Sequence, residues 1–158
     1  MIKIIQYDPS HQVYFEQLHR TWFTEHFHMQ PETSDEFLLT QPQKAILQLG
    51  GAILVAKIEN TLAGTVALKK QDEEAYELLK MAVQKEYRGM GVGMELVKAA
   101  IRKAKFLGAK KIILYSHSSL HAAVCLYKKV GFSKIALESG TCNQFRCDVK
   151  MELTLDQT

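Results

Sequence analysis

The sequence predicts a mixed α/β fold built on one twisted, mostly antiparallel sheet that contains a single parallel pair of strands. Three observations support this prediction. Residues 52–83 hold three strand-like runs separated by short polar turns, as in an antiparallel meander. The hydrophobic pattern then changes to a helical period over 94–107 and returns to a strand-like run over 111–116. A strand–helix–strand unit of this kind places its two strands parallel.

Length and composition limit the class of protein. The chain has 158 residues, of which 47% are hydrophobic and 23% charged, so a single globular domain over 1–158 is expected rather than disorder. No apolar run approaches the roughly 18 residues that span a bilayer. The N-terminal segment lacks the apolar stretch of a signal peptide, so we expect a cytoplasmic protein without a membrane partner. The net charge of +3, without a basic stripe, does not favour a nucleic-acid partner.

The cysteines are too few to predict a framework. There are three of them, Cys125, Cys142 and Cys147, and none lies in a C-x-x-C spacing. An odd number without that spacing disfavours both a disulfide framework and a structural zinc site. We expect neither, and we expect Cys125 to be a core residue of a helix.

The N-terminal part is expected to form a strand and a long helix. A strand-like run over 2–7 leads into Asp8-Pro9-Ser10, a turn sequence that can also cap a helix. The helix then runs from about residue 11 to 27. Its apolar face is expected to contain Phe15, Leu18 and Trp22.

The middle of the chain is expected to add a short helix and the meander. The spacing Thr33-x-x-Glu36 resembles a capping box, and Gln41-Pro42 ends the helix that it starts. Residues 43–49 can hold another helical turn. The strands of the meander are then expected over 52–58, 62–70 and 75–83.

The C-terminal part continues with alternating helices and strands. Glycines are expected to end both helices, because a residue after a helix often needs a left-handed conformation. The expected elements are a helix over 94–107 followed by Gly108, a strand over 111–116, a helix over 120–130 followed by Gly131, and two strands over 132–138 and 145–155.

The connection between the strand at 75–83 and the helix at 94–107 has the character of an anion site. Gly89, Gly91 and Gly93 alternate along it, and glycines let successive N–H groups point at one ligand. The positive end of the helix dipole adds to the attraction. Arg88 lies at the edge of this turn, where a guanidinium can pair with phosphate.

Three kinds of glycine-rich phosphate site can be compared with this spacing. A P-loop needs G-x-x-x-x-G-K-[ST], which the chain lacks. A dinucleotide fingerprint would need a third glycine where Met94 stands. The pattern R-x-x-G-x-G is met by Arg88, Gly91 and Gly93. A glycine-rich turn without a ligand remains the alternative.

The pattern R-x-x-G-x-G resembles the coenzyme A pyrophosphate loop of the GNAT family of N-acetyltransferases, and the order of elements resembles that family over nearly the whole chain. Glu77 lies eleven residues before Arg88, as does the general-base glutamate of the histone-acetylating branch. Arg146-x-Asp148-x-x-Met151 resembles a common closing strand of small members. A further match, to the family's C-terminal acetyl-CoA motif, is carried by Ala123, Leu126, Tyr127, Gly131 and Phe132.

The resemblance implies acetyl-CoA as co-substrate and no metal. The pyrophosphate would meet the backbone N–H groups of Arg88, Gly89, Met90, Gly91, Val92 and Gly93. The pantetheine arm would pair with Met81, Ala82 and Val83 like an extra strand, at the place where the two parallel strands part. The N–H of Met81 or Ala82 would polarise the thioester carbonyl.

The resemblance also assigns catalytic roles. Glu77 would take the proton of the amine, directly or through water; the alternative is an ordinary carboxylate that competes with Glu73 and Glu74. Tyr127 would protonate the leaving thiolate; the alternative is a packed tyrosine that only shapes the cofactor site. His117 is a candidate secondary acid or base, or simply a loop residue.

Other residues are candidates for contacts with the acceptor or the cofactor. Glu25 and His26 follow the first helix, in the region that borders the acceptor pocket in this family. Lys128 and Lys129 can meet the 3′-phosphate of coenzyme A or can be solvated helix residues. Leu120 stands where the family often has an asparagine, whose hydrogen bond would then be lost or supplied by a neighbouring serine.

The sequence thus implies an acetyl-CoA-dependent N-acetyltransferase in which a primary amine of a small molecule, amino acid or protein attacks the thioester directly. The alternative is a catalytically silent acyl-CoA-binding sensor. A nucleotide-binding domain is disfavoured by the glycine spacing. The resemblance allows a homodimer. It also assigns the choice of acceptor to the loops after the first helix and near residues 139–145.

Overall fold

The computed structural model describes residues 1–27, 32–142 and 146–155. The strands in this part of the chain are β1 (Ile2–Gln6), β2 (Ala52–Ile58), β3 (Thr61–Lys70), β4 (Ala75–Val83), β5 (Lys111–Ser116), β6 (Ser133–Ile135) and β7 (Val149–Thr154). The helices are α1 (Gln12–Phe27), α2 (Thr33–Thr40), α3 (Val92–Phe106) and α4 (His121–Lys129), with short helical turns η1 (Pro9–His11), η2 (Gln43–Leu47) and η3 (Lys85–Tyr87).

The strands form one sheet in the order β1-β2-β3-β4-β5-β7-β6. Its neighbouring strands are antiparallel except β4 and β5, which are parallel. The predicted fold class, a mostly antiparallel sheet with one parallel pair around a helix, is therefore confirmed. No helix of the described residues is long and apolar enough to cross a membrane.

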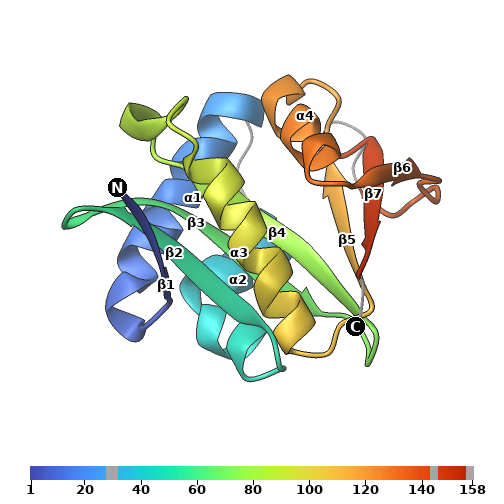
Figure 1. Ribbon diagram of the computed structural model, residues 1–158, viewed down its shortest axis with the longest axis horizontal. Helices are drawn as coiled ribbons and strands as arrows, with labels where there is room; N and C mark the ends of the chain where they lie inside the picture. The colour runs from blue at the N-terminus through green and yellow to red at the C-terminus, as the bar shows by residue number, and fades with distance from the viewer. Residues whose placement is uncertain (28–31, 143–145, 156–158) are drawn as a thin grey trace.

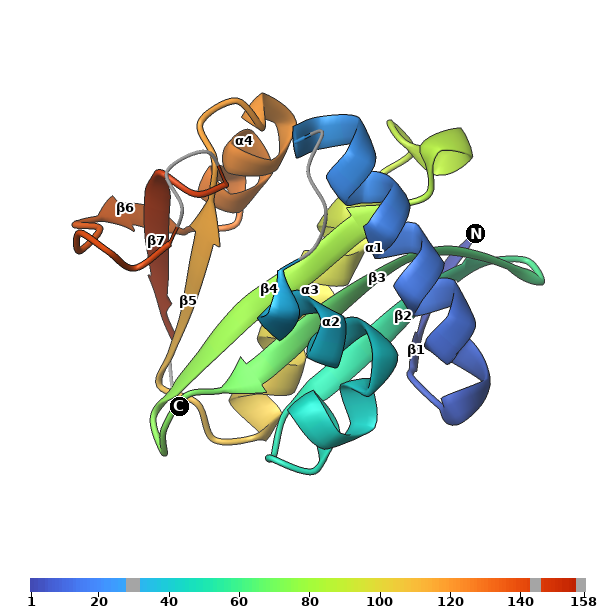
Figure 2. The same ribbon diagram turned by 180° about the vertical axis from the view of Figure 1, so that it is seen from behind.

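Helices cover both faces of the sheet. Figure 1 shows α3 lying across one face, and Figure 2 shows α1 and α2 on the opposite face. Because side chains alternate along a strand, each face has its own core. Leu54 and Ala56 belong to the core under α3, whereas Ile53 and Val55 belong to the core under α1 and α2.

The buried face of α1 differs from the predicted one. The helix buries Phe15, Leu18, His19 and Phe23, whereas Trp22 is only partly buried. The prediction of Trp22 as a core residue was wrong because the helix packs along the 15–19–23 line. A polar partner makes this possible, since the buried His19 ring lies 2.8 Å from Thr65 Oγ1 on β3.

Two element boundaries also differ from the predicted ones. Helix α2 takes Glu32 as its N-cap, and the Glu32 N–H bonds the Asp35 carboxylate at 3.0 Å, so the capping box begins one residue before Thr33. Strand β6 ends at Ile135 and β7 begins at Val149, so both are shorter than predicted. Residues 143–145, which include the predicted first residue of the second of these strands, lie outside the described residues.

Candidate active site

The sheet opens between its two parallel strands. β4 and β5 pair only over Ala75–Glu77 and Lys111–Ile113. Beyond this point the strands diverge toward α4, as Figure 1 shows, so the far half of β4 has no partner strand on that side. An unpaired strand edge offers N–H and C=O groups to an extended ligand.

A β-bulge in β4 lies beside this opening. Thr65 pairs with Ala82 and Ala67 pairs with Leu79, so Lys80 and Met81 together face a single residue of β3. Lys80 has a φ of 52°, which is unusual for a residue with a side chain. A bulge redirects the side chains and backbone groups that follow it, and bulges are frequent next to active sites.

A cavity of about 1030 Å³ occupies the opening, large enough for a cofactor arm and a small acceptor. Its lining comes from α1 and α2 on one face of the sheet and from α3 and α4 on the other. Of the predicted site residues, the lining includes His26, Glu77, Met81, Ala82, Val83, Arg88, Gly89, Gly91, Val92, Gly93 and Tyr127. It does not include Glu25, Met90 or His117.

Gly91 and Gly93 of the anion loop, residues 88–93, are required for different structural reasons. Gly91 is the N-cap of α3 with φ 88°, and a Cβ there would meet nothing within 4 Å, so the position needs glycine for its conformation. At Gly93 a Cβ would lie 3.2 Å from Leu126 Cδ1, so this position lets α3 approach α4 closely. Helix α3 begins at Val92, inside the loop, which places its positive end at the cavity.

Arg88 joins two sides of the cavity mouth. Its Nη2 lies 3.1 Å from Glu25 Oε2, and its Nε donates to the Val83 carbonyl at 3.2 Å. Glu25, predicted to contact the acceptor, is therefore the ion-pair partner of the residue predicted to meet the pyrophosphate. Phosphate would have to compete with this carboxylate for the guanidinium.

Glu77 is the last residue of β4 that pairs with β5, and the two strands separate after it. Its carboxylate accepts a hydrogen bond of 2.9 Å from Gln71 Nε2. Burial raises the pKa of Glu77, and the nearby Lys69 and Lys80 only partly oppose this. A carboxylate with a raised pKa is a stronger base near neutral pH.

Tyr127 is a buried residue of α4 that also lines the cavity. Its ring packs edge-on against Phe132 at 5.8 Å. Burial raises the pKa of the Tyr127 hydroxyl above its usual value, so the hydroxyl carries its proton at neutral pH. The Tyr127 side chain can thus pack in the hydrophobic core and still donate its hydroxyl proton to a group in the cavity.

A family model described as the acetyltransferase (GNAT) family matches residues 13–132. The chain belongs to the GNAT acetyltransferase family.

Two relatives agree with this assignment. The chain is 32% identical over 111 residues to a mycothiol acetyltransferase of Corynebacterium efficiens, matching 69% of this chain and only 38% of that protein. It is 36% identical over 115 residues to the uncharacterized N-acetyltransferase YvbK of Bacillus subtilis, matching 68% of this chain and 74% of that protein.

Two crystal structures share the fold. A GNAT-family acetyltransferase of Staphylococcus aureus has a TM-score of 0.85 and 23% identity, with 99% of this chain and 100% of that one covered. YncA of Salmonella typhimurium, solved with acetyl-CoA, has a TM-score of 0.77 and 17% identity, with 100% and 96% covered.

Leu120 lies in the segment before α4, at the position where the resemblance implied an asparagine. It is the N-cap of α4 and makes no side-chain capping bond. Ser118 does not replace it in the cavity, because its N–H and Oγ both bond Asp148 at 2.7 Å. Ser119 Oγ lies 2.7 Å from His117 Nδ1, so His117 is held by its own loop.

The remaining candidates are placed at the edges of the site. His26 lines the cavity and contacts the Trp22 ring at 4.8 Å; burial and Arg88 lower the pKa of His26, which keeps it neutral at pH 7. Lys129 lines a separate groove between α3 and α4 with Lys98 and Arg102. No three His, Cys, Asp or Glu side chains of the described residues gather as metal ligands.

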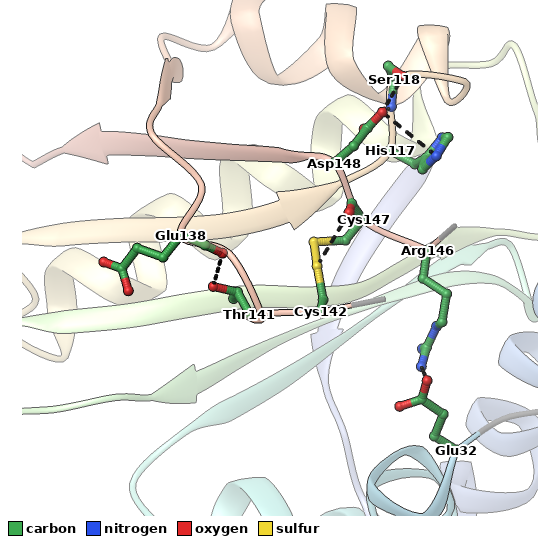
Figure 3. Close-up of a disulfide and its surroundings, with 9 residues drawn as sticks. All are labelled: Glu32, His117, Ser118, Glu138, Thr141, Cys142, Arg146, Cys147 and Asp148. Atoms are coloured by element: carbon green, nitrogen blue, oxygen red, sulfur yellow. Dashed lines mark hydrogen bonds and ion pairs between the residues drawn. A yellow bond between two sulfur atoms is a disulfide. The ribbon is translucent and has the colours of Figure 1, made fainter. Parts of the chain in front are cut away.

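The expectation about cysteines was wrong. Cys142 and Cys147 form a disulfide in the segment before β7, as Figure 3 shows. The third cysteine made the count odd, and that residue, Cys125, is exposed on α4 rather than buried. A spacing of five residues lets two cysteines of one connection approach, and their Cα atoms lie 6.0 Å apart.

Sequence reasoning missed a charged cluster in the cavity wall. Lys80, Asp35 and Arg146 all line the cavity, and Asp35 forms an ion pair with each of the two cations. One signal was available, because Lys80 is the only charged residue in the apolar run from 78 to 83. Its partners could not be found from spacing, since they lie in distant parts of the chain.

Proposed function

We propose that this chain is an acetyl-CoA-dependent N-acetyltransferase, in which a primary amine attacks the thioester directly. One observation carries the proposal: the anion loop, the unpaired edge of β4 and Tyr127 surround a single cavity in a chain of the GNAT family. The acceptor is a small molecule, an amino acid or a protein amine. The cytoplasmic location and the homodimer stay predictions, as does the absence of a metal or nucleic-acid partner.

The cofactor is held by backbone groups. N–H groups across 88–93 and the positive end of α3 bind the pyrophosphate. The pantetheine arm lies along the open edge of β4 at 81–83, where it adds main-chain hydrogen bonds like a further strand. The N–H of Met81 or Ala82 then polarises the thioester carbonyl and stabilises the oxyanion of the tetrahedral intermediate.

Glu77 removes the amine proton through water. An alkylammonium has a pKa near 10, so it must be deprotonated before it can attack. Met81 lies four residues after Glu77, which corresponds to at most about 13 Å at roughly 3.3 Å per residue, and the bulge at Lys80 and Met81 shortens this distance. The separation favours transfer through a bridging water over direct contact between the carboxylate and an amine at the Met81 N–H.

Tyr127 completes the reaction. The amine nitrogen forms a bond to the acyl carbon, the tetrahedral intermediate collapses, and the carbon–sulfur bond breaks. The electrons of that bond leave as a thiolate, which takes the Tyr127 proton to give free coenzyme A. The second proton of the amine nitrogen passes through water to Tyr127 and restores its hydroxyl, and the first leaves Glu77 for solvent. The products are the amide and the thiol.

A thiol-release assay with acetyl-CoA and a panel of primary amines tests the proposal. Tyr127→Phe and Glu77→Gln should lower kcat, each by roughly a hundredfold, as is typical when a general acid or base is lost. The controls are Tyr14→Phe and Glu73→Gln, which keep the same chemical changes outside the cavity lining. Acetyl-CoA binding by calorimetry without turnover of any amine would favour the sensor, and failure to bind coenzyme A would overturn both functions.

A further inference from the structure

A charged cluster, formed by Asp35, Lys80, Arg146 and Glu32, lies in the wall of the cavity that α1, α2, β4 and the segment before β7 build. The proposed acetyl transfer does not use these side chains. The cluster nevertheless lies beside the proposed position of the thioester, because Lys80 directly precedes Met81 in the bulge of β4.

Asp35 is the centre of the cluster. Its Oδ1 lies 2.9 Å from Lys80 Nζ, and its Oδ2 lies 2.9 Å from Arg146 Nη2. The Glu32 N–H also bonds Oδ2, at 3.0 Å. The three ionised side chains are mostly buried, with 8% of Asp35, 10% of Lys80 and 18% of Arg146 exposed. One buried carboxylate therefore serves two buried cations.

Phe23 fixes the positions of both cations. Lys80 Nζ lies 4.8 Å and the Arg146 guanidinium carbon 4.7 Å from the centre of its ring. A guanidinium held against an aromatic ring and a carboxylate has little freedom left, so it is pre-organised to receive a further planar anion.

The charges of the buried part do not balance. Among the side chains in direct contact, Lys80 and Arg146 against Asp35 leave one positive charge. Glu77 also acts on Lys80 through space, but no ion pair joins it to these three side chains. Burial lowers the pKa of Lys80, and the ion pair with Asp35 opposes that shift. Glu32 approaches Arg146 Nη1 at 3.1 Å, but its side chain is 51% exposed and water screens its charge. His19 and His26 are neutral at pH 7, because burial lowers the pKa of both rings, so they do not change the sum.

Figure 3 shows the Glu32 and Arg146 side chains pointing toward each other. Arg146 extends from the disulfide-bonded segment toward Glu32 at the start of α2. Glu32 and Arg146 belong to different segments of the chain. The exposed Glu32 side chain can therefore rotate into solvent without breaking the ion pairs of Asp35 with Lys80 and Arg146. A carboxylate that enters the cavity can then take its place on Arg146.

We infer that Arg146, held by Asp35 and Phe23, binds a carboxylate of the acceptor, so that the acceptor is an amino acid or another amine that carries a carboxylate. Arg146 and the adjoining Lys80 supply the positive charge, and the acceptor's carboxylate displaces Glu32. The inference rests on the proposed function, because the same cavity must hold the reacting amine near Met81.

Matched acceptors test the inference. The common amino acids and their carboxamides share the amine and the side chain and differ in the carboxylate. Because the amide also lowers the pKa of the α-amine, kcat/KM is compared per unprotonated amine, from rates measured over a range of pH. Wild type should favour the acid by about tenfold or more in kcat/KM, mostly through KM, because a charge-assisted contact is lost in the amide. Arg146→Gln should remove that preference by lowering kcat/KM for the acids much more than for the amides. Glu32→Gln should keep or increase it, because the competing carboxylate is gone.

Several outcomes would overturn the inference. Equal turnover of acids and amides by wild type would do so, as would polyamines being better acceptors than either. An equal loss on both acceptors in Arg146→Gln would show a purely structural role. If Arg146→Gln does not fold, the ratios of kcat/KM for the acid to kcat/KM for the amide in wild type and in Glu32→Gln still test the inference.

A binding arm separates this inference from the proposed function. If no amine is acetylated, calorimetric titration of acids and amides into the coenzyme A-loaded wild-type protein still tests the carboxylate site. Binding of an acid but not of its amide supports the site even when the enzymatic proposal has failed. Binding of neither, or of both with equal affinity, overturns it.

Discussion

Replacing Asp35 with asparagine should destabilise the protein strongly, because the substitution keeps the shape of the side chain and removes the charge that Lys80 and Arg146 share. Burial acts to raise the pKa of Asp35, but Lys80, the hydrogen bonds and Arg146 outweigh it and hold that pKa below its usual value. The carboxylate is therefore charged at neutral pH, and its removal leaves two buried cations without their common partner.

The size of the effect follows from the surroundings. Breaking a buried ion pair from one side costs about 3–5 kcal/mol. The lower end, about 3 kcal/mol, applies here for two reasons: Glu32 still contacts Arg146, and Lys80 can give up its proton, because burial lowers the pKa of Lys80. For a chain of this length that corresponds to a fall in Tm of about 6–12 °C.

Urea and thermal unfolding of Asp35→Asn at pH 7 measure the effect. Glu73→Gln is the control, because the Glu73 carboxylate is exposed and pairs only loosely, at 3.5 Å, with Lys70. Asp35→Asn combined with Lys80→Met should be more stable than Asp35→Asn alone, since one uncompensated cation is removed. The stability from Asp35 is present above its unfolded pKa near 3.8 and lost as pH falls through its lower folded value. The difference from wild type should therefore shrink in acid.

The reasoning would be refuted by a loss below about 1 kcal/mol, the range of an ordinary surface substitution. It would also be refuted if the double variant were no more stable than the single one, because the surplus of positive charge would then have no energetic consequence.

Three further predictions concern pH and redox state. Because burial raises the pKa of Glu77, the acid limb of the kcat/KM profile should lie above the ordinary carboxylate value of 4.5, with activity lost as pH falls, and Glu77→Gln should abolish that limb. Burial lowers the pKa of His19 to about 3, so the folded state resists its protonation and stability should be lost as pH falls from 6.5 toward that value. His19→Gln, which can still hydrogen-bond Thr65, should have a flatter profile of unfolding free energy against pH. Reduction of the Cys142–Cys147 disulfide should raise the KM of the acceptor several-fold and leave the KM of acetyl-CoA unchanged, because both cysteines line the acceptor side of the cavity. A Cys142→Ser, Cys147→Ser double variant that is insensitive to reductant provides the control, and an equal response of both KM values would contradict this assignment.

Much of the architecture followed from local patterns. The meander over 52–83, the helix after the glycine-rich loop and the parallel return strand were all predicted from hydrophobic period and turn residues. These signals are local, because the period of a strand or helix is contained in about ten consecutive residues. The anion loop was predictable for the same reason, since the left-handed conformation of Gly91 belongs to one residue.

The errors concern contacts that hydrophobic period and residue counts do not specify. The buried face of α1 was misjudged by one position, because the choice between Trp22 and Phe23 depends on β4 and on the residue that His19 meets. The disulfide was missed because a count of cysteines contains no distances. The start of α2 shifted by one residue, since Glu32 and Asp35 cap the helix in place of Thr33.

The sequence by itself determined that this chain forms a sheet with one parallel pair, and that a glycine-rich loop from Arg88 to Gly93 leads into a helix. Spacing along the chain specifies both features, and the family resemblance follows from them. Only the tertiary structure decided which charged side chains meet. Asp35, Lys80 and Arg146 come from three distant segments, and their contact depends on the divergence of β4 from β5 and on a bulge at one residue. Burial then makes their charges matter, because a charge surplus that water would screen at the surface persists in the wall of a cavity.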